Sequence, residues 1–232
     1  TITAAYLYFA ATATPQDAAW LAREMAAHFP AELEDALADV AARARTEKWE
    51  PSRTRRALER RARFLASREV LDLQSLERLC EKSASLDGAR SEAAAYVQET
   101  SDFLLARALS ELAREAGLSG ADSVPPAWEP PHTEAEARAA SMVPTRTSKG
   151  PFVMRNLDLS KELQEAHDAF RKKHGPAGRI LTCVQYWADG QRSVADIADC
   201  VEGETGHRDI DAIADYVDLL AKAGALATKG RQ

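Results

Sequence analysis

The sequence predicts an all-α protein, in which a helical hairpin or bundle is followed by a small winged-helix-like module with at most a short β wing. Three observations predict this class. The 232 residues are rich in Ala, Leu, Glu and Arg, which favour helices, and include only 11 Gly and 10 Pro. Apolar residues recur at three- and four-residue steps through most of the chain. Since 45% of the residues are hydrophobic, the chain can bury a core.

We expect three regions along the chain. A helical bundle with a long antiparallel hairpin covers 1–118, a Pro-rich connecting segment covers 119–157, and the winged-helix-like module covers 158–232. Six prolines between Gly120 and Pro151 interrupt regular structure and set this boundary. The segment also carries large apolar groups, which indicates that it packs on the helical body instead of remaining free.

The chain opens with an apolar run from Ile2 to Phe9. A helix that is apolar on nearly every face has to be buried, so we expect that a domain once preceded Thr1. The alternative role of Thr1 as an autoprocessed nucleophile needs a strand-rich scaffold, which the sequence does not predict. The run is too short to span a bilayer, and no signal peptide is visible.

The first region should hold two shorter helices and two long ones. Thr14, followed by proline, starts the first helix, and Pro30 should end it. A second amphipathic helix follows and ends before Ser52, which we expect to cap a long helix that breaks at Gly88. The other long helix closes at Gly117. The two long helices form the predicted hairpin.

The last region has the outline of a winged helix. Ser193 should cap its middle helix, which Gly203 and Gly206 break. A strand after Gly224 supplies the wing. The other expected helices cover 159–173, 179–188 and 209–223, and the strand covers 225–227.

Charge is unevenly distributed along the chain. The formal net charge of −6 argues against nucleic-acid binding, which favours a basic surface. However, the stretch from Arg43 to Arg63 has nine basic and three acidic residues, and the stretch from Asp196 to Asp218 has eight acidic residues and one arginine. The two stretches could attract each other or form separate solvated helix faces.

The acidic third helix of the last region argues against DNA recognition. Carboxylates repel phosphates, and only Arg208 and Lys222 are basic there. We therefore expect this helix to contact a protein or a basic peptide, with packing on its own chain as the alternative. The candidate docking residues are Asp209, Asp211, Asp215 and Asp218.

No catalytic residue, metal ligand or cofactor site is predicted in this chain. The three cysteines are far apart and lack metal or redox spacing, which favours a reduced cytoplasmic protein. The histidines are scattered, and no phosphate loop or nucleophile motif occurs. The cysteines are Cys80, Cys183 and Cys200, and the histidines are His28, His132, His167, His174 and His207.

Two stretches resemble a known family. The run from Thr3 to Phe9 is similar to the last catalytic-domain helix of bacterial di-zinc exopeptidases, the leucyl aminopeptidases and their glutamate-carboxypeptidase-like relatives. A C-terminal helical module of such enzymes is similar to three stretches near the end of this chain, 186–193, 204–206 and 215–224. The segment that joins the two parts in those enzymes is similar to Val143-Pro144 and Gly150-Pro151. The resemblance implies a zinc-dependent parent hydrolase, whose ligands and general base lie upstream of this chain. It thus implies a non-catalytic accessory region that braces the catalytic domain, limits access to its cleft or builds an oligomer.

A turn within the last region carries a second resemblance. It looks like the turn of small winged-helix modules that bind leader peptides in peptide-modifying enzymes, which implies a peptide-binding module as an alternative function. The turn residues are Trp187, Asp189, Gly190, Arg192 and Ser193. A transcription regulator that uses the stretch from Arg43 to Arg63 to contact DNA is a third hypothesis.

The partners expected from these hypotheses are a missing N-terminal catalytic domain, a basic peptide or a second copy of the chain, and no membrane is expected.

Overall fold

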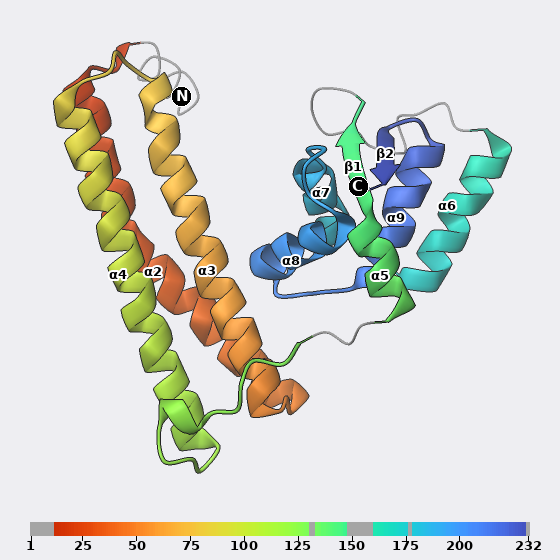
Figure 1. Cartoon of the computed structure of the whole chain (residues 1–232), viewed down its shortest axis with the longest axis horizontal. Coiled ribbons are helices and arrows are strands. Elements are labelled where there is room, and N and C mark those ends of the chain that lie inside the picture. The colour runs from red at the N-terminus through yellow and green to blue at the C-terminus, as the bar shows by residue number, and fades with distance from the viewer. Residues whose placement is uncertain (1–11, 130–132, 148–159, 176–177, 231–232) are drawn as a thin grey trace. The chain divides into compact units, whose positions relative to one another are not determined.

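The chain divides into two compact units, which we call the bundle unit (Thr1–Trp128) and the C-terminal unit (Glu129–Gln232) (Figure 1). The computed structural model describes residues 12–129, 133–147, 160–175 and 178–230. Apart from one antiparallel strand pair, the regular elements of these residues are helices, which confirms the predicted all-α class. The apolar run from Ile2 to Phe9 and the Gly150-Pro151 pair lie outside the described residues.

The bundle unit consists of three long helices (Figure 1). Helix α2 packs against both of the others. The hairpin predicted from two long helices is thus part of a three-helix bundle. The elements are α2 (Pro15–Glu47), α3 (Pro51–Ser75), the short 3₁₀ helix η1 (Leu76–Arg78), α4 (Ala84–Glu115) and the 3₁₀ helix η2 (Ala121–Ser123).

Helix α2 continues through Pro30, so the prediction of two separate helices there was wrong. An internal proline destabilises a helix by roughly 3 kcal/mol because it removes a hydrogen bond and its ring clashes with the preceding turn. Buried side chains flank the proline, among them Phe29 and Leu33, which are 1% and 0% exposed. Since burying one such side chain contributes roughly 1.5–3 kcal/mol, packing outweighs the local penalty.

Two of the predicted helix boundaries are confirmed, and two are wrong. The Thr14 side chain accepts a hydrogen bond from the Asp17 N–H in a capping box, and Gly117, with a φ of 69°, follows the last turn of α4. Ser52 lies inside α3, because Glu50 precedes the first helical residue, Pro51. Gly88 lies inside α4, which starts four residues earlier at Ala84, with Ser83 as its N-cap.

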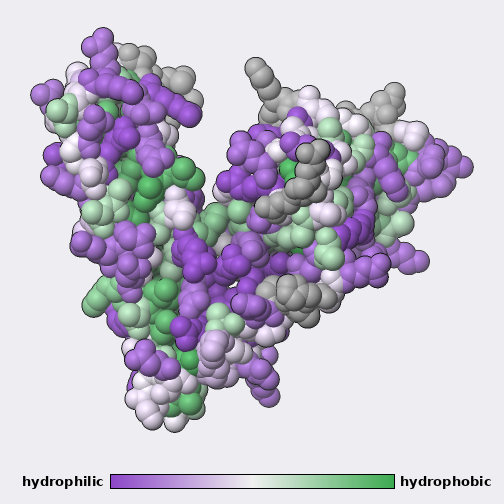
Figure 2. All heavy atoms as spheres, viewed as in Figure 1, coloured by the Kyte–Doolittle hydropathy of each residue, from purple (hydrophilic) through white to green (hydrophobic). Residues whose placement is uncertain are grey.

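The core of the bundle unit lies along the contact lines of the three helices. Its buried side chains are mostly leucines and alanines, spaced so that each helix turns one apolar stripe inward. On the face shown in Figure 2, hydrophobic residues of the bundle unit lie along the helices between hydrophilic ones. The largest buried side chains are Phe29, Leu33, Leu58, Leu65, Leu73, Leu86 and Val97.

The C-terminal unit consists of helices around one two-stranded antiparallel sheet (Figure 1). Strand β1 pairs with β2 so that Val143 lies opposite Lys229 and Thr145 opposite Ala227. The elements are α5 (Glu134–Ser141), β1 (Met142–Arg146), α6 (Lys161–His174), α7 (Gly178–Trp187), α8 (Val194–Thr205), α9 (Ile210–Lys222) and β2 (Leu226–Gly230).

This unit differs from the predicted module in where it begins. Helix α5 and strand β1 come from the segment expected to be a connector, and Ala139 of α5 is fully buried in the unit's core. Ser193 caps α8 as predicted, through a capping box with Asp196. Helix α8 runs through Gly203, however, and ends before Gly206, whose left-handed backbone forms its C-cap. Gly203 is therefore not the predicted helix break.

Candidate functional site

The four candidate docking aspartates lie on or just before α9, but they do not form a free acidic surface. The Asp209 side chain caps the helix by accepting a hydrogen bond from the Ala212 N–H at 2.9 Å. Asp211 is exposed. Asp218 forms an ion pair with Arg138 of α5. Some of the negative charges counted in the sequence, those of Asp209 and Asp218, therefore already have partners within the fold.

Asp215 is the most engaged of the four. Its carboxylate lies 2.7 Å from Lys173 Nζ and 2.9 Å from His174 Nε2, both at the end of α6, and 3.6 Å from Arg138 Nη1. Partial burial opposes ionisation of this carboxyl, but hydrogen bonds from Lys173 and His174 outweigh it and lower the pKa of Asp215. Asp215 and Asp218 therefore attach α5 and α6 to α9, and a basic peptide would have to compete with these contacts.

The predicted turn between α7 and α8 is held by its own side chains. Asp189 Oδ1 accepts hydrogen bonds from the backbone N–H groups of Gln191 and Arg192 at 2.9 and 3.1 Å. Partial burial of Asp189 favours the neutral carboxyl, but the hydrogen bonds from Gln191 and Arg192 favour the carboxylate more strongly. The pKa of Asp189 is therefore below its ordinary value. Trp187 donates to Glu204 at 3.2 Å, and the Arg192 guanidinium stacks 5.0 Å from the Trp187 ring centroid.

Gly190 joins this turn to strand β1. Its backbone φ is 81°, and its N–H donates to the Pro144 carbonyl at 2.9 Å. A Cβ at this position would lie 2.4 Å from Thr145 Oγ1, so only glycine fits without rearrangement. The turn residues that resemble a family motif therefore have structural contacts that account for them.

Arg208, one of the two basic residues near the third helix, is not available to a phosphate. It donates to Glu136 of α5 at 2.5 Å and to Asp199 of α8 at 3.0 Å, and its side chain is 12% exposed. Burial lowers the pKa of this guanidinium, but the hydrogen bonds to the two carboxylates outweigh it and raise the pKa. Sequence reasoning missed Glu136 because it assigned that residue to the connecting segment.

Part of the basic stretch from Arg43 to Arg63 is also engaged within the bundle unit. Arg45 forms a two-point ion pair with Glu115, and Arg55 pairs with Glu59 at 2.7 Å. Arg56 is buried and donates to the Trp128 carbonyl at 3.4 Å. The arrangement does not favour the hypothesis that this stretch binds nucleic acid.

Exposed aromatic side chains form a surface that the sequence interpretation missed. Trp20 of α2 and Tyr96 and Phe103 of α4 are 55%, 46% and 66% exposed. Tyr96 and Phe103 are seven residues apart and so share one face of α4. Arg107, four residues further on, pairs with Glu34 of α2 at 3.0 Å, so this face lies beside α2.

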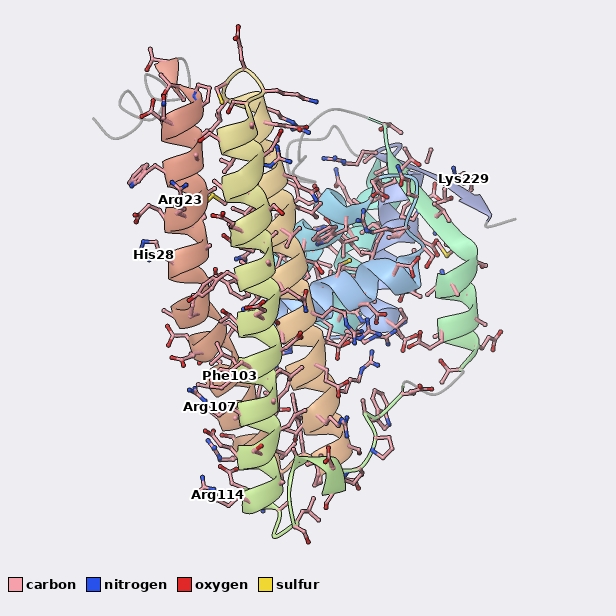
Figure 3. The ribbon with its side chains drawn as sticks, turned by 60° about the vertical axis from the view of Figure 1, so that its left-hand side comes forward. Arg23, His28, Phe103, Arg107, Arg114 and Lys229 are labelled. Carbon is pink, nitrogen blue, oxygen red and sulfur yellow. The ribbon has the colours of Figure 1, made fainter. Side chains whose placement is uncertain are left out.

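Trp20 lies on the matching face of α2, since Glu34 follows it by fourteen residues, close to four full turns. Figure 3 shows Phe103, Arg107 and Arg114 on one side of α4. We call the surface of Trp20, Tyr96 and Phe103 the aromatic face. The signal that could have revealed it was the seven-residue spacing of Tyr96 and Phe103.

Within the described ranges, no group of three or more His, Cys, Asp or Glu side chains is placed to hold a metal ion. Among the same residues, no helix has the length and apolarity needed to cross a membrane. Comparison with protein-family models, curated proteins and solved structures gives no match to this chain.

Proposed function

We propose that this chain is a non-catalytic accessory region of a zinc-dependent aminopeptidase-like hydrolase, and that its aromatic face binds the catalytic domain. The observation that supports protein binding is the exposure of Trp20, Tyr96 and Phe103 along the two neighbouring helices α2 and α4. Tryptophan and tyrosine are enriched among the residues that dominate protein interfaces, and an exposed apolar patch marks such a surface.

The choice of partner rests on the resemblance of the run from Thr3 to Phe9 to the last helix of an exopeptidase catalytic domain. In the proposed parent protein, the catalytic domain is covalently joined close to the start of α2 at Pro15. Trp20 lies in the second turn of α2, so the aromatic face begins next to the junction. A short linker gives a high effective concentration, which favours contact at this position.

The surroundings of the aromatic face support a partner of mixed apolar and acidic character. Arg23 of α2, three residues after Trp20, is exposed and forms no ion pair within the described part of the chain. A cation beside an apolar centre resembles the polar rim of a protein interface. Acidic groups on the catalytic domain would complement this cation.

The test is co-expression of this chain with the polypeptide encoded directly upstream of it, followed by co-purification and measurement of bound zinc. We expect a zinc-containing complex. Phe103→Ala should weaken it at least tenfold, because truncating an interface anchor typically loses more than about 1.4 kcal/mol. Leu71→Ala is the matched control, since Leu71 is 55% exposed on the other long helix, α3. Failure to co-purify, or an upstream partner without zinc, would contradict the proposal.

A second candidate function, peptide binding by the C-terminal unit, is supported by strand β2. Four of its five residues are exposed, and among the described residues its only pairing strand is β1. An exposed strand edge can bind an extended peptide through main-chain hydrogen bonds. Calorimetry with basic peptides at low and high salt tests this function, and the absence of heat at both salt concentrations would exclude it for such peptides.

A further inference from the structure

A pocket opens between α2 and α4, near the end of the bundle unit where α3 begins. Its volume is about 370 Å³, within the range of roughly 300–1,000 Å³ that small-molecule sites occupy. Leu37, Leu58, Leu104 and Leu112 from all three long helices contribute apolar lining. The pocket lies further along α2 and α4 than the aromatic face, and no residue of that face lines it.

Small side chains create this space. Ala38, Ala41 and Ala44 line it from α2, and Ala108 lines it from α4. Elsewhere in the bundle the space between the helices is filled, for example by Leu33 and Leu65, which are both fully buried. The alanines thus leave an apolar pocket that extends from the surface toward α3.

Ion pairs between α2 and α4 limit the length of the opening. Arg107 Nη2 lies 3.0 Å from Glu34 Oε1, and Arg45 Nη2 lies 2.5 Å from Glu115 Oε1. The second pair is about 16 Å further along α2 than the first, at 1.5 Å per residue. Both pairs line the pocket, so a long partner helix could not lie in it without breaking them. A small molecule fits this opening better.

Six charged residues surround the pocket, and one of them is an available cation. Arg107 pairs with Glu34 and also approaches Glu111 at 3.9 Å, and the Glu115 side chain engages Arg45. The hydrogen bond to Glu115 raises the pKa of Arg45, as expected for a tight pair. Lys48 is exposed at the C-cap of α2 and makes no ion pair within the residues that the structure describes.

We propose that this pocket binds a single-chain amphiphile with one anionic head group, such as a fatty acid. The alkyl chain would lie against the leucines and alanines, where its burial provides most of the affinity. The carboxylate would lie at the mouth beside Lys48, where it stays solvated and gains an ion pair. Trp49 flanks this lysine and is held between the guanidinium groups of Arg43 and Arg53, at 5.1 and 4.9 Å from its ring centroid.

The test is calorimetry of the whole chain with dodecanoate below its micelle concentration, with dodecyltrimethylammonium as the probe of opposite charge. We expect one dodecanoate site per chain and weaker binding of the cation. Ala108→Leu should abolish binding by filling the pocket. Ala106→Leu is the matched control, because Ala106 is exposed on the same helix and does not line the pocket. If Ala108→Leu does not fold, as judged by circular dichroism, Ala38→Leu tests the same space from α2.

The contribution of the head group is tested separately. Lys48→Gln should weaken dodecanoate binding about two- to fivefold, as expected for an exposed ion pair, and leave dodecyltrimethylammonium binding unchanged or stronger. Lys82→Gln is the control at an exposed position outside the pocket. The proposal is overturned if the chain does not bind dodecanoate, if the Ala106 and Ala108 variants lose affinity equally, or if the cation binds as tightly as dodecanoate. None of these results depends on whether the aromatic face binds a catalytic domain.

Discussion

Replacing Gly190 by alanine should destabilise the C-terminal unit through two separable effects. The residue has a φ of 81°, and an L-residue in this left-handed region costs about 1–2 kcal/mol. The new Cβ would also lie 2.4 Å from Thr145 Oγ1 and 3.2 Å from Thr145 Cγ2. Forcing such an overlap in a packed site costs about 1–3 kcal/mol. The expected loss is therefore about 2–5 kcal/mol.

A control and a second substitution separate the two effects. Gly224 lies in the same unit with a φ of 72°, and a Cβ there would meet nothing within 4 Å, so Gly224→Ala should cost only about 1–2 kcal/mol. Thr145→Ala removes Oγ1 and Cγ2 and keeps only the Cβ, 3.3 Å away, so Gly190→Ala in that background should lose little more than the backbone contribution.

The assay is native-state hydrogen exchange of α7 to α9 by mass spectrometry, because it measures the opening free energy of this unit alone. A chain with two units need not unfold in a single global transition, so a bulk denaturation curve would be harder to assign. Equal losses for Gly190→Ala and Gly224→Ala would refute the argument, since the contact with Thr145 would then have no effect. So would the absence of energetic coupling between positions 145 and 190.

Three further predictions concern charge and backbone. Arg208→Ala leaves its carboxylate partners unpaired and should destabilise the C-terminal unit by about 2–4 kcal/mol, measured by the same exchange assay. In the folded chain the pKa of Asp215 lies below its ordinary value of 3.8. The ionised carboxylate therefore stabilises the folded unit at pH values above 3.8, and this stabilisation is lost as the pH falls through the pKa of the folded state. Asp215→Asn should therefore reduce the loss of stability in acid, and an unchanged pH profile would contradict this. Pro30→Ala should stabilise the bundle unit by about 1–3 kcal/mol in urea unfolding, because α2 is already continuous there.

Local patterns in the sequence predict the helices and several of their ends. The capping box at Ser193 is an example, because the side chains that form it are three residues apart. Strand β1 was not predicted, since it is five residues long, contains Pro144, and is stabilised by pairing with β2 at the far end of the unit. Short strands depend on such distant partners, which no local pattern reveals.

The candidate docking site shows the same limit for electrostatics. Counting charges along α9 identifies an acidic helix, but it does not identify the cations that the fold places beside it. Arg138 was assigned to a connector, yet it pairs with Asp215 and Asp218. The aromatic face was missed for the opposite reason. Its spacing is visible in the sequence, but only the packing of α2 beside α4 brings Trp20 onto the same surface as Phe103.

The pairing of β1 with β2 also has a consequence for how the C-terminal unit forms during synthesis. Strand β1 is the second described element of the unit and β2 follows all its other described elements, so the sheet cannot close until β2 has emerged from the ribosome. Until then the edge of β1 that faces β2 is unpaired. The core of the unit is also incomplete, because it lacks Leu226, which is only 3% exposed in the folded unit. This unit should consequently fold late and cooperatively, whereas the bundle unit, which precedes it, can assemble while translation continues.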